Sequence, residues 1–277
     1  MKTKKIFYLF LITSLLITSC SSDDDSNNPG EISQPGNYFP SSLNNYWIYD
    51  VMSTDNSINE TTVSTDSLYV ISETATTFTL DVNDNMMANG AMDSFLTNGI
   101  LTPTENNLTL NGTLELPPEI SDLVDFEINL SNVILYDTEA TLGAELSSNS
   151  NTIEQDFNGI PISINYELTT NALGFSESMT LNGETYSNVI SSDLKLNLSV
   201  IATIDVSGFP IDIAILESQD VLSITNYYVQ SIGLVRSESE SSYEISDAFQ
   251  LTGIEIGVPV SGSTSNIQEL FEYLVAE

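Results

Sequence analysis

The residue types that most often carry catalysis are scarce in this chain. Histidine is absent and Cys20 is the only cysteine, which removes the usual general base and every Ser-His-Asp or Cys-His arrangement. Ser192 and Lys195 have the S-x-x-K spacing in which a lysine activates a serine from the next helical turn. Apolar and polar residues alternate from Leu194 to Val200, however, so we expect a strand on which Ser192 and Lys195 face opposite sides. The sequence therefore predicts a protein that is not an enzyme and has no catalytic residues.

Carboxylates are the one abundant type of reactive group. The chain has 39 aspartates and glutamates, and two carboxyl groups can hydrolyse glycosides without histidine. No particular pair is marked among so many. A carboxylate-based surface glycoside hydrolase is therefore the alternative function, and it requires two carboxyl groups about 5 to 9.5 Å apart in a cleft lined by aromatic residues.

The polar segment DVNDN at 81–85 groups oxygen ligands that suit calcium. Asp81, Asn83 and Asn85 are the candidate ligands, and calcium is the only cofactor that the sequence suggests. The segment lacks the glycine and the distant glutamate of an EF-hand loop. A β-turn with Asx side chains is the alternative explanation.

Aromatic residues gather in the segment NYWIYD at 45–50. Because side chains alternate along a strand, Trp47 and Tyr49 share one face, and Tyr46 and Ile48 share the other. Trp47 and Tyr49 form a candidate ligand face, since rings with polar tips suit binding surfaces. A strand buried on both sides explains the same residues.

The N-terminus has the layout of a secretory signal peptide over residues 1–19. Lysines precede an apolar run from Ile6 to Ile17, which is shorter than the about 20 residues that span a bilayer. The segment ITSC at 17–20 resembles the lipobox of bacterial lipoproteins. That resemblance implies cleavage before Cys20 and acylation of this cysteine, with palmitate among the expected acyl groups, so we expect a lipid anchor.

A polar segment separates the expected anchor from the apolar part of the chain. Residues 20–37 are rich in serine, asparagine, proline and glycine, which predicts a disordered acidic tether. Asp23, Asp24 and Asp25 resemble the signal that sends Bacteroidota lipoproteins to the outer face of the outer membrane. A solvated spacer is the alternative.

The charge balance restricts the partners. Five basic residues oppose 39 acidic ones, and loss of three lysines with the signal peptide would change the net charge from −34 to −37. Such a charge repels phosphate backbones and anionic lipid surfaces, so we expect no nucleic-acid partner. The expected partners are the membrane, reached through the lipid anchor, and an apolar, glycan or protein ligand that the sequence does not identify.

Residues 38–277 read as a β-rich globular domain. Alternating apolar and polar residues, with asparagine or glycine at the breaks, predict strands near 45–52, 61–72, 76–82, 107–116, 126–136, 151–157, 160–169, 186–206, 209–217, 221–230 and 232–240. One helix is predicted at the C-terminus. Its apolar face would consist of Ile267, Leu270, Phe271, Leu274 and Val275, and Ser265 with Gln268 would form a capping box.

A short repeat marks the middle of the chain. DFNGIPISI and DVSGFPIDI begin at Asp156 and Asp205, 49 residues apart, and GVPVS follows at the same interval. A glycine two residues before a proline, between alternating runs, is typical of turns. We therefore expect Gly159, Gly208 and Gly257 at corresponding corners of the sheet.

Three segments resemble a broad group of Bacteroidota outer-membrane lipoproteins: YFPSSLNNYWIYDV, NGETYSNVI and TNYYVQSIGLVRSE. The matching residues are Tyr38, Phe39, Pro40, Trp47, Gly183, Tyr186, Tyr228, Gly233 and Val235. The resemblance implies a single curved antiparallel sheet of half-barrel or open-barrel type, comparable to periplasmic lipoprotein carriers. The group's function is generally unassigned, and no catalytic residue is carried over. This chain has Gln230 before Ser231 and Ile232 where the group has a lysine.

These observations favour a cell-envelope lipoprotein at the outer membrane, expected at the cell surface. We expect it to serve as a non-enzymatic binding or structural module.

Overall fold

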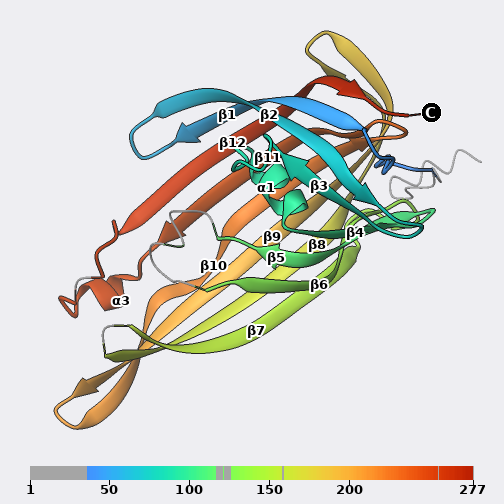
Figure 1. The fold of residues 1–277 in the computed structure, drawn as a ribbon. Coiled ribbons are helices and arrows are strands. Elements are labelled where there is room, and N and C mark those ends of the chain that lie inside the picture. The colour runs from blue at the N-terminus through green and yellow to red at the C-terminus, as the bar shows by residue number, and fades with distance from the viewer. Residues whose placement is uncertain (1–35, 117–120, 122–125, 158, 255, 277) are drawn as a thin grey trace, which may run out of the picture.

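The computed structural model describes residues 36–116, 121, 126–157, 159–254 and 256–276. These residues form one antiparallel sheet of twelve strands that curls until it is nearly closed into a barrel (Figure 1). The mainly β fold with a single curved antiparallel sheet is the predicted one. Two short helices accompany the sheet, α1 (Ala91–Thr97) and α3 (Asp247–Gln250). Among the described residues, no helix combines the length and apolar character needed to cross a membrane.

The strands lie in the sheet in the order β6-β5-β4-β3-β2-β1-β12-β11-β10-β9-β8-β7. Consecutive strands are therefore neighbours, except β6 and β7, which lie at the two ends of the order. The last strand, β12, lies between β11 and β1 and joins the two halves of the sheet. Their bounds are β1 (Tyr46–Asp55), β2 (Glu60–Glu73), β3 (Phe78–Val82), β4 (Gly99–Pro103), β5 (Asn107–Leu114), β6 (Ile128–Asp137), β7 (Glu145–Phe157), β8 (Ile160–Leu181), β9 (Glu184–Val206), β10 (Phe209–Val229), β11 (Gly233–Glu244) and β12 (Ser261–Leu274).

Strand β9 shows how the alternation builds the core. Leu194, Leu196, Leu198 and Val200 are all at most 1 % exposed, and polar residues between them face outward. This two-residue period is the one that a strand with one buried face requires. Two strands run beyond the predicted bounds: β8 continues to Leu181, and β10 is one strand where two are predicted. Strand β4 is not among the predicted ones.

The two edge strands of the sheet, β6 and β7, approach each other and are joined through side chains. Ser147 Oγ and Asn149 Oδ1 of β7 accept hydrogen bonds from the backbone N–H groups of Ile134 and Ser131 of β6, at 3.1 and 3.2 Å. The two strands share no ladder in the sheet order. At this seam between β6 and β7, hydrogen bonds from backbone to side chain therefore stand in place of backbone pairing.

The repeated turns are confirmed at two of the three glycines. Gly159 joins β7 to β8 and Gly208 joins β9 to β10, with φ of +84° and +88°. The N–H group of each donates to the aspartate three residues earlier, Asp156 or Asp205, at 2.7 Å. The expectation for Gly257 is wrong, because this residue lies in the connection from α3 to β12 and joins no pair of neighbouring strands.

One end of the barrel is filled by aromatic side chains. The rings of Phe39 and Trp47 lie 5.1 Å apart, and so do those of Tyr136 and Tyr228. Trp47 Nε1 donates to the Ile232 carbonyl at 2.6 Å. Most of the residues that carry the Bacteroidota resemblance are buried there or nearby: Tyr38, Phe39, Pro40, Trp47, Tyr228, Gly233 and Val235.

The predicted C-terminal helix is wrong. Residues 261–274 form β12, a central strand that pairs with β1 and β11 along both edges. Gln268 and Leu270 face inward, whereas Phe271 and Leu274 of the expected apolar face are exposed. Two ladders of backbone hydrogen bonds, available only in the folded sheet, outweigh the local helical periodicity.

Candidate functional site

Helix α1 lies inside the curve of the sheet, between β3 to β5 on one side and β11 and β12 on the other (Figure 1). The buried Asp66 of β2 fixes the loop that precedes α1. Asp66 accepts from the backbone N–H groups of Asn89 and Gly90, at 2.9 and 2.7 Å. It also accepts from the side-chain amides of Asn83 and Asn89, at 2.7 and 2.6 Å. One carboxylate thus satisfies several donors that the turn leaves unpaired.

Gln268 of β12 caps the N-terminus of α1. Its Oε1 accepts from the N–H groups of Met92 and Asp93, at 2.9 and 3.4 Å. Gly90, the N-cap residue, supplies no side-chain cap. A Cβ on Gly90 would lie 2.1 Å from Gln268 Cδ, so glycine is required for this close approach. The helix is therefore positioned by a residue of the sheet.

Asp93 is the charged residue of helix α1. The side chain is fully buried, and neither carboxyl oxygen has a hydrogen-bond partner of normal geometry among the described residues. Burial and the nearby charge of Asp66 raise the pKa of Asp93 well above its ordinary value, and the amide of Gln268 opposes this increase. Burial therefore favours the protonated, neutral form of Asp93. The phenol of Tyr49, which also faces Asp93, has a raised pKa because it is fully buried.

A cavity of about 350 Å³ lies beside α1, and we call it the α1 cavity. Its size is at the lower end of the range of small-molecule sites. The lining comes from the α1 region, the end of β5, and β10, β11, β12 and β1: Ser53, Met87, Ala88, Asn89, Gly90, Ala91, Ser94, Phe95, Asn98, Leu114, Glu115, Leu116, Leu222, Ile224, Ser239, Ser241, Thr264, Ser265 and Asn266.

The sheet wall of the α1 cavity changes from apolar to polar across neighbouring strands. One cross-strand row consists of Leu222 of β10, Ser241 of β11 and Thr264 of β12. The next row runs from Ile224 through Ser239 to Asn266 and Ser53. Because neighbouring strands are about 4.8 Å apart, the wall becomes hydroxyl-rich within about 10 Å.

Ser241 is the clearest polar group without a partner in this wall. The residue is 4 % exposed, and its Oγ has no hydrogen-bond partner among the described residues. A buried hydroxyl of this kind costs free energy unless a bound molecule satisfies it. The α1 cavity therefore combines apolar surface with an available hydrogen-bonding group.

The structure places the candidate ligand face in the packed core. Trp47 and Tyr49 are both fully buried and face inward, and neither lines the α1 cavity. Trp47 donates to Ile232, and the Tyr49 hydroxyl donates to the Leu234 carbonyl at 2.9 Å. Their polar atoms therefore join β1 to the start of β11 and to the turn before it.

The candidate calcium ligands lie in and after β3. Asp81 accepts from the Tyr69 hydroxyl at 3.0 Å and from the Val82 N–H group at 2.7 Å. Asn83 Oδ1 accepts from the N–H group of Ser67 at 2.9 Å. Asn83 and Asn85 adopt left-handed backbone, with φ of +53° and +64°. Among the described residues, no three acidic, histidine or cysteine side chains form a group suited to a metal ion, and the calcium site stays a prediction.

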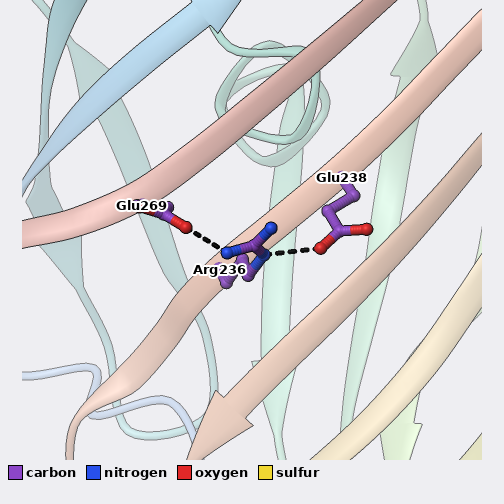
Figure 2. Close-up of polar contacts among 3 residues, drawn as sticks. All are labelled: Arg236, Glu238 and Glu269. Atoms are coloured by element: carbon purple, nitrogen blue, oxygen red, sulfur yellow. Dashed lines mark hydrogen bonds and ion pairs between the residues drawn. The ribbon is translucent and has the colours of Figure 1, made fainter. Parts of the chain in front are cut away.

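The expected separation of Ser192 and Lys195 is confirmed. Ser192 faces inward and donates to the Leu135 carbonyl at 2.5 Å, whereas Lys195 is 44 % exposed and lies 3.5 Å from the Asp193 carboxylate. Arg236 is similarly engaged. Figure 2 shows its guanidinium between Glu238 of the same strand and Glu269 of β12, with both carboxylates accepting from it. In the described part of the chain, these two cations are therefore neutralised by neighbours.

The remaining predicted positions, Cys20 and Asp23 to Asp25, lie outside the described residues. Comparisons with protein-family models, with curated proteins and with solved structures found no match.

Sequence reasoning did not find the residues that build this site. Gln268 was interpreted as a capping residue of its own segment, and it caps a helix 176 residues away. Asp66, Asp93 and Ser241 stand among many similar residues. The available signal was the segment NMMANGAMDSF at 85–95, in which apolar residues lie at helical spacing after an asparagine-rich turn.

Proposed function

We propose that this chain is a non-enzymatic lipoprotein of the bacterial outer membrane, anchored through Cys20 and exposed at the cell surface, and that its barrel binds an apolar or amphipathic ligand. The resemblance to Bacteroidota lipoproteins supports the location. The observation that carries the binding function is the α1 cavity, which lies within the curved sheet and is lined by helix and strand residues.

Preorganisation supports a binding role for this cavity. The helix that forms one wall is fixed at its N-terminus by Asp66 and Gln268, from two different strands. Because this wall is already held in place, less conformational entropy is lost when a ligand binds.

The lining of the α1 cavity supports a non-enzymatic role. Its residues are apolar, hydroxyl or amide side chains, with Glu115 as the single charged one among those described. Glu115 is exposed, and no second carboxyl group joins it among the described lining residues, whereas a glycosidase needs a pair. Recognition without chemistry is what such a lining serves best.

One observation favours the alternative, a carboxylate-based glycoside hydrolase. Asp66 and Asp93 interact electrostatically, and the pKa of Asp93 is raised, as that of a general acid would be. Both side chains are fully buried, however, and neither lines the α1 cavity. A substrate would have no contact with either carboxyl group.

The binding function is tested with the neutral fluorophore N-phenyl-1-naphthylamine, whose emission rises in apolar surroundings. Ser239 faces the α1 cavity, and Ser239→Phe should fill it and remove most of the saturable signal. Ser242→Phe is the matched control, because Ser242 lies on the opposite face of the same strand. Equal binding by both variants would reject the α1 cavity as the site.

The hydrolase alternative is tested by incubating the wild type and Asp93→Asn with neutral oligosaccharides. A hydrolase would release reducing ends and lose this activity in Asp93→Asn. Our proposal expects no release by the wild type.

A further inference from the structure

We propose that the ligand of the α1 cavity is an uncharged amphiphile, with an alkyl chain and a hydroxylated head group, of the chemistry of a monoacylglycerol. This inference rests on the proposed function and names the ligand class for the same site. Three features of the cavity lead to it: an apolar side, a hydroxyl-rich side and the absence of a buried charge among the lining residues that the structure describes.

The apolar side suits an alkyl chain. Phe95 of α1 and Leu222 and Ile224 of β10 are each at most 4 % exposed, and all three line the cavity. Leu114 at the end of β5 extends this surface. Burying a methylene group against such residues is favourable by about 0.8 kcal/mol, which a wholly polar ligand such as a free glycan would not gain.

The neighbouring side of the wall, on β11 and β12, suits hydroxyl groups. Ser241 offers a buried Oγ without a partner among the described residues, and Ser239 and Thr264 lie beside it in the sheet. Serine and threonine hydroxyls both donate and accept hydrogen bonds, as the hydroxyls of a glycerol or sugar head group do. A purely apolar ligand would leave Ser241 unsatisfied.

Charge decides between head groups. The single charged residue of the lining is Glu115, which is exposed and acidic. The chain carries a net charge of −34, and the described cations Lys195 and Arg236 are paired with carboxylates. An anionic head group would find no cation and would be repelled over long range. A cationic head group placed among these serines would lose its hydration without a buried partner.

The test compares three amphiphiles of matched chain length: monododecanoylglycerol, dodecanoate and dodecyltrimethylammonium. Each displaces N-phenyl-1-naphthylamine from the full chain carrying Cys20→Ala, purified without detergent and assayed below the micelle concentration of each amphiphile. We expect the neutral amphiphile to bind at least tenfold more tightly than either charged one. Equal or tighter binding of dodecanoate or of dodecyltrimethylammonium would overturn the inference and leave the proposed function intact. Fluorophore binding without displacement by any of the three would also overturn the inference, whereas no fluorophore binding at all would overturn the proposed function itself.

Ser241→Ala supplies a second readout. It should weaken monododecanoylglycerol roughly fivefold, the effect of one net hydrogen bond, and leave the affinity of the fluorophore unchanged. Ser242→Ala, on the outer face of the same strand, should change neither value. An unchanged affinity for monododecanoylglycerol in Ser241→Ala would reject the hydroxyl-rich side as the head-group site.

Discussion

Gln268 on β12 accepts a hydrogen bond from the backbone N–H group of Met92 on α1, at 2.9 Å. The two residues are 176 positions apart in the chain, and their bond connects the central strand of the sheet to the helix that walls the α1 cavity. The position of α1, and with it the shape of the cavity, therefore depends on a contact that only the complete barrel can form.

Removing this cap should destabilise the protein. Gln268→Ala leaves the buried N–H groups of Met92 and Asp93 without an acceptor, which costs about 1 to 3 kcal/mol. Denaturant unfolding measures the change. Ser178→Ala, at an exposed position of β8, is the control and should change the free energy of unfolding by about 0.5 kcal/mol or less. Similar losses in the two variants would contradict a capping role for Gln268.

Asp93 makes stability depend on pH in a specific direction. Its pKa is raised in the folded state, so the unfolded state releases this proton first as pH increases. The contribution of the protonated Asp93 is fully present below the unfolded pKa, near 3.8. It declines by up to about 1.4 kcal/mol per pH unit until the folded pKa is reached.

Asp93→Asn does not titrate and should lose this decline. The free energy of unfolding of Asp93→Asn relative to the wild type should therefore rise as the pH increases above the unfolded pKa, near 3.8, measured by urea unfolding at several pH values. Asp84→Asn, at an exposed turn, controls for the loss of one surface carboxyl group. Parallel curves for the wild type and Asp93→Asn would show that Asp93 is not buried as described.

Strand periodicity was readable in the sequence because it is a local property. The alternation of leucine with polar residues at 194–200 predicted β9, and the repeated glycines predicted two of the hairpin turns. Helix α1 was missed because its N-cap, Gly90, carries no side-chain acceptor and Gln268 supplies the cap from the other end of the chain. The C-terminal strand was mistaken for a helix for the same reason, since its partners β1 and β11 decide its conformation. The α1 cavity, a gap between elements far apart in sequence, leaves no local pattern.

Gly233 should tolerate no side chain. A Cβ there would lie 3.0 Å from Trp47 Nε1, and φ is +119°. Gly208 has φ of +88° with open space around it. Gly208→Ala should cost about 1 kcal/mol for backbone strain alone, and Gly233→Ala at least about 1 kcal/mol more, because it also displaces the Trp47 ring. Thermal unfolding compares the two variants, and equal losses would indicate that Trp47 does not pack against Gly233.

The seam between β6 and β7 should open when its side-chain bonds are removed. Ser147→Ala deprives the N–H group of Ile134 of its acceptor, so hydrogen exchange of this amide should become at least about tenfold faster. Ser148→Ala is the neighbouring control, because Ser148 bonds to Glu167 of β8. Unchanged exchange at Ile134 in Ser147→Ala would mean that other contacts hold the seam closed.

The central claim is that the α1 cavity holds a ligand, and native mass spectrometry of the protein isolated from the cells that express it tests this most directly. The wild type should carry a bound small molecule that is released on unfolding, Ser242→Phe should carry the same molecule, and Ser239→Phe should carry none. A wild type without any bound molecule, or a Ser239→Phe variant that retains the same one, would contradict the claim.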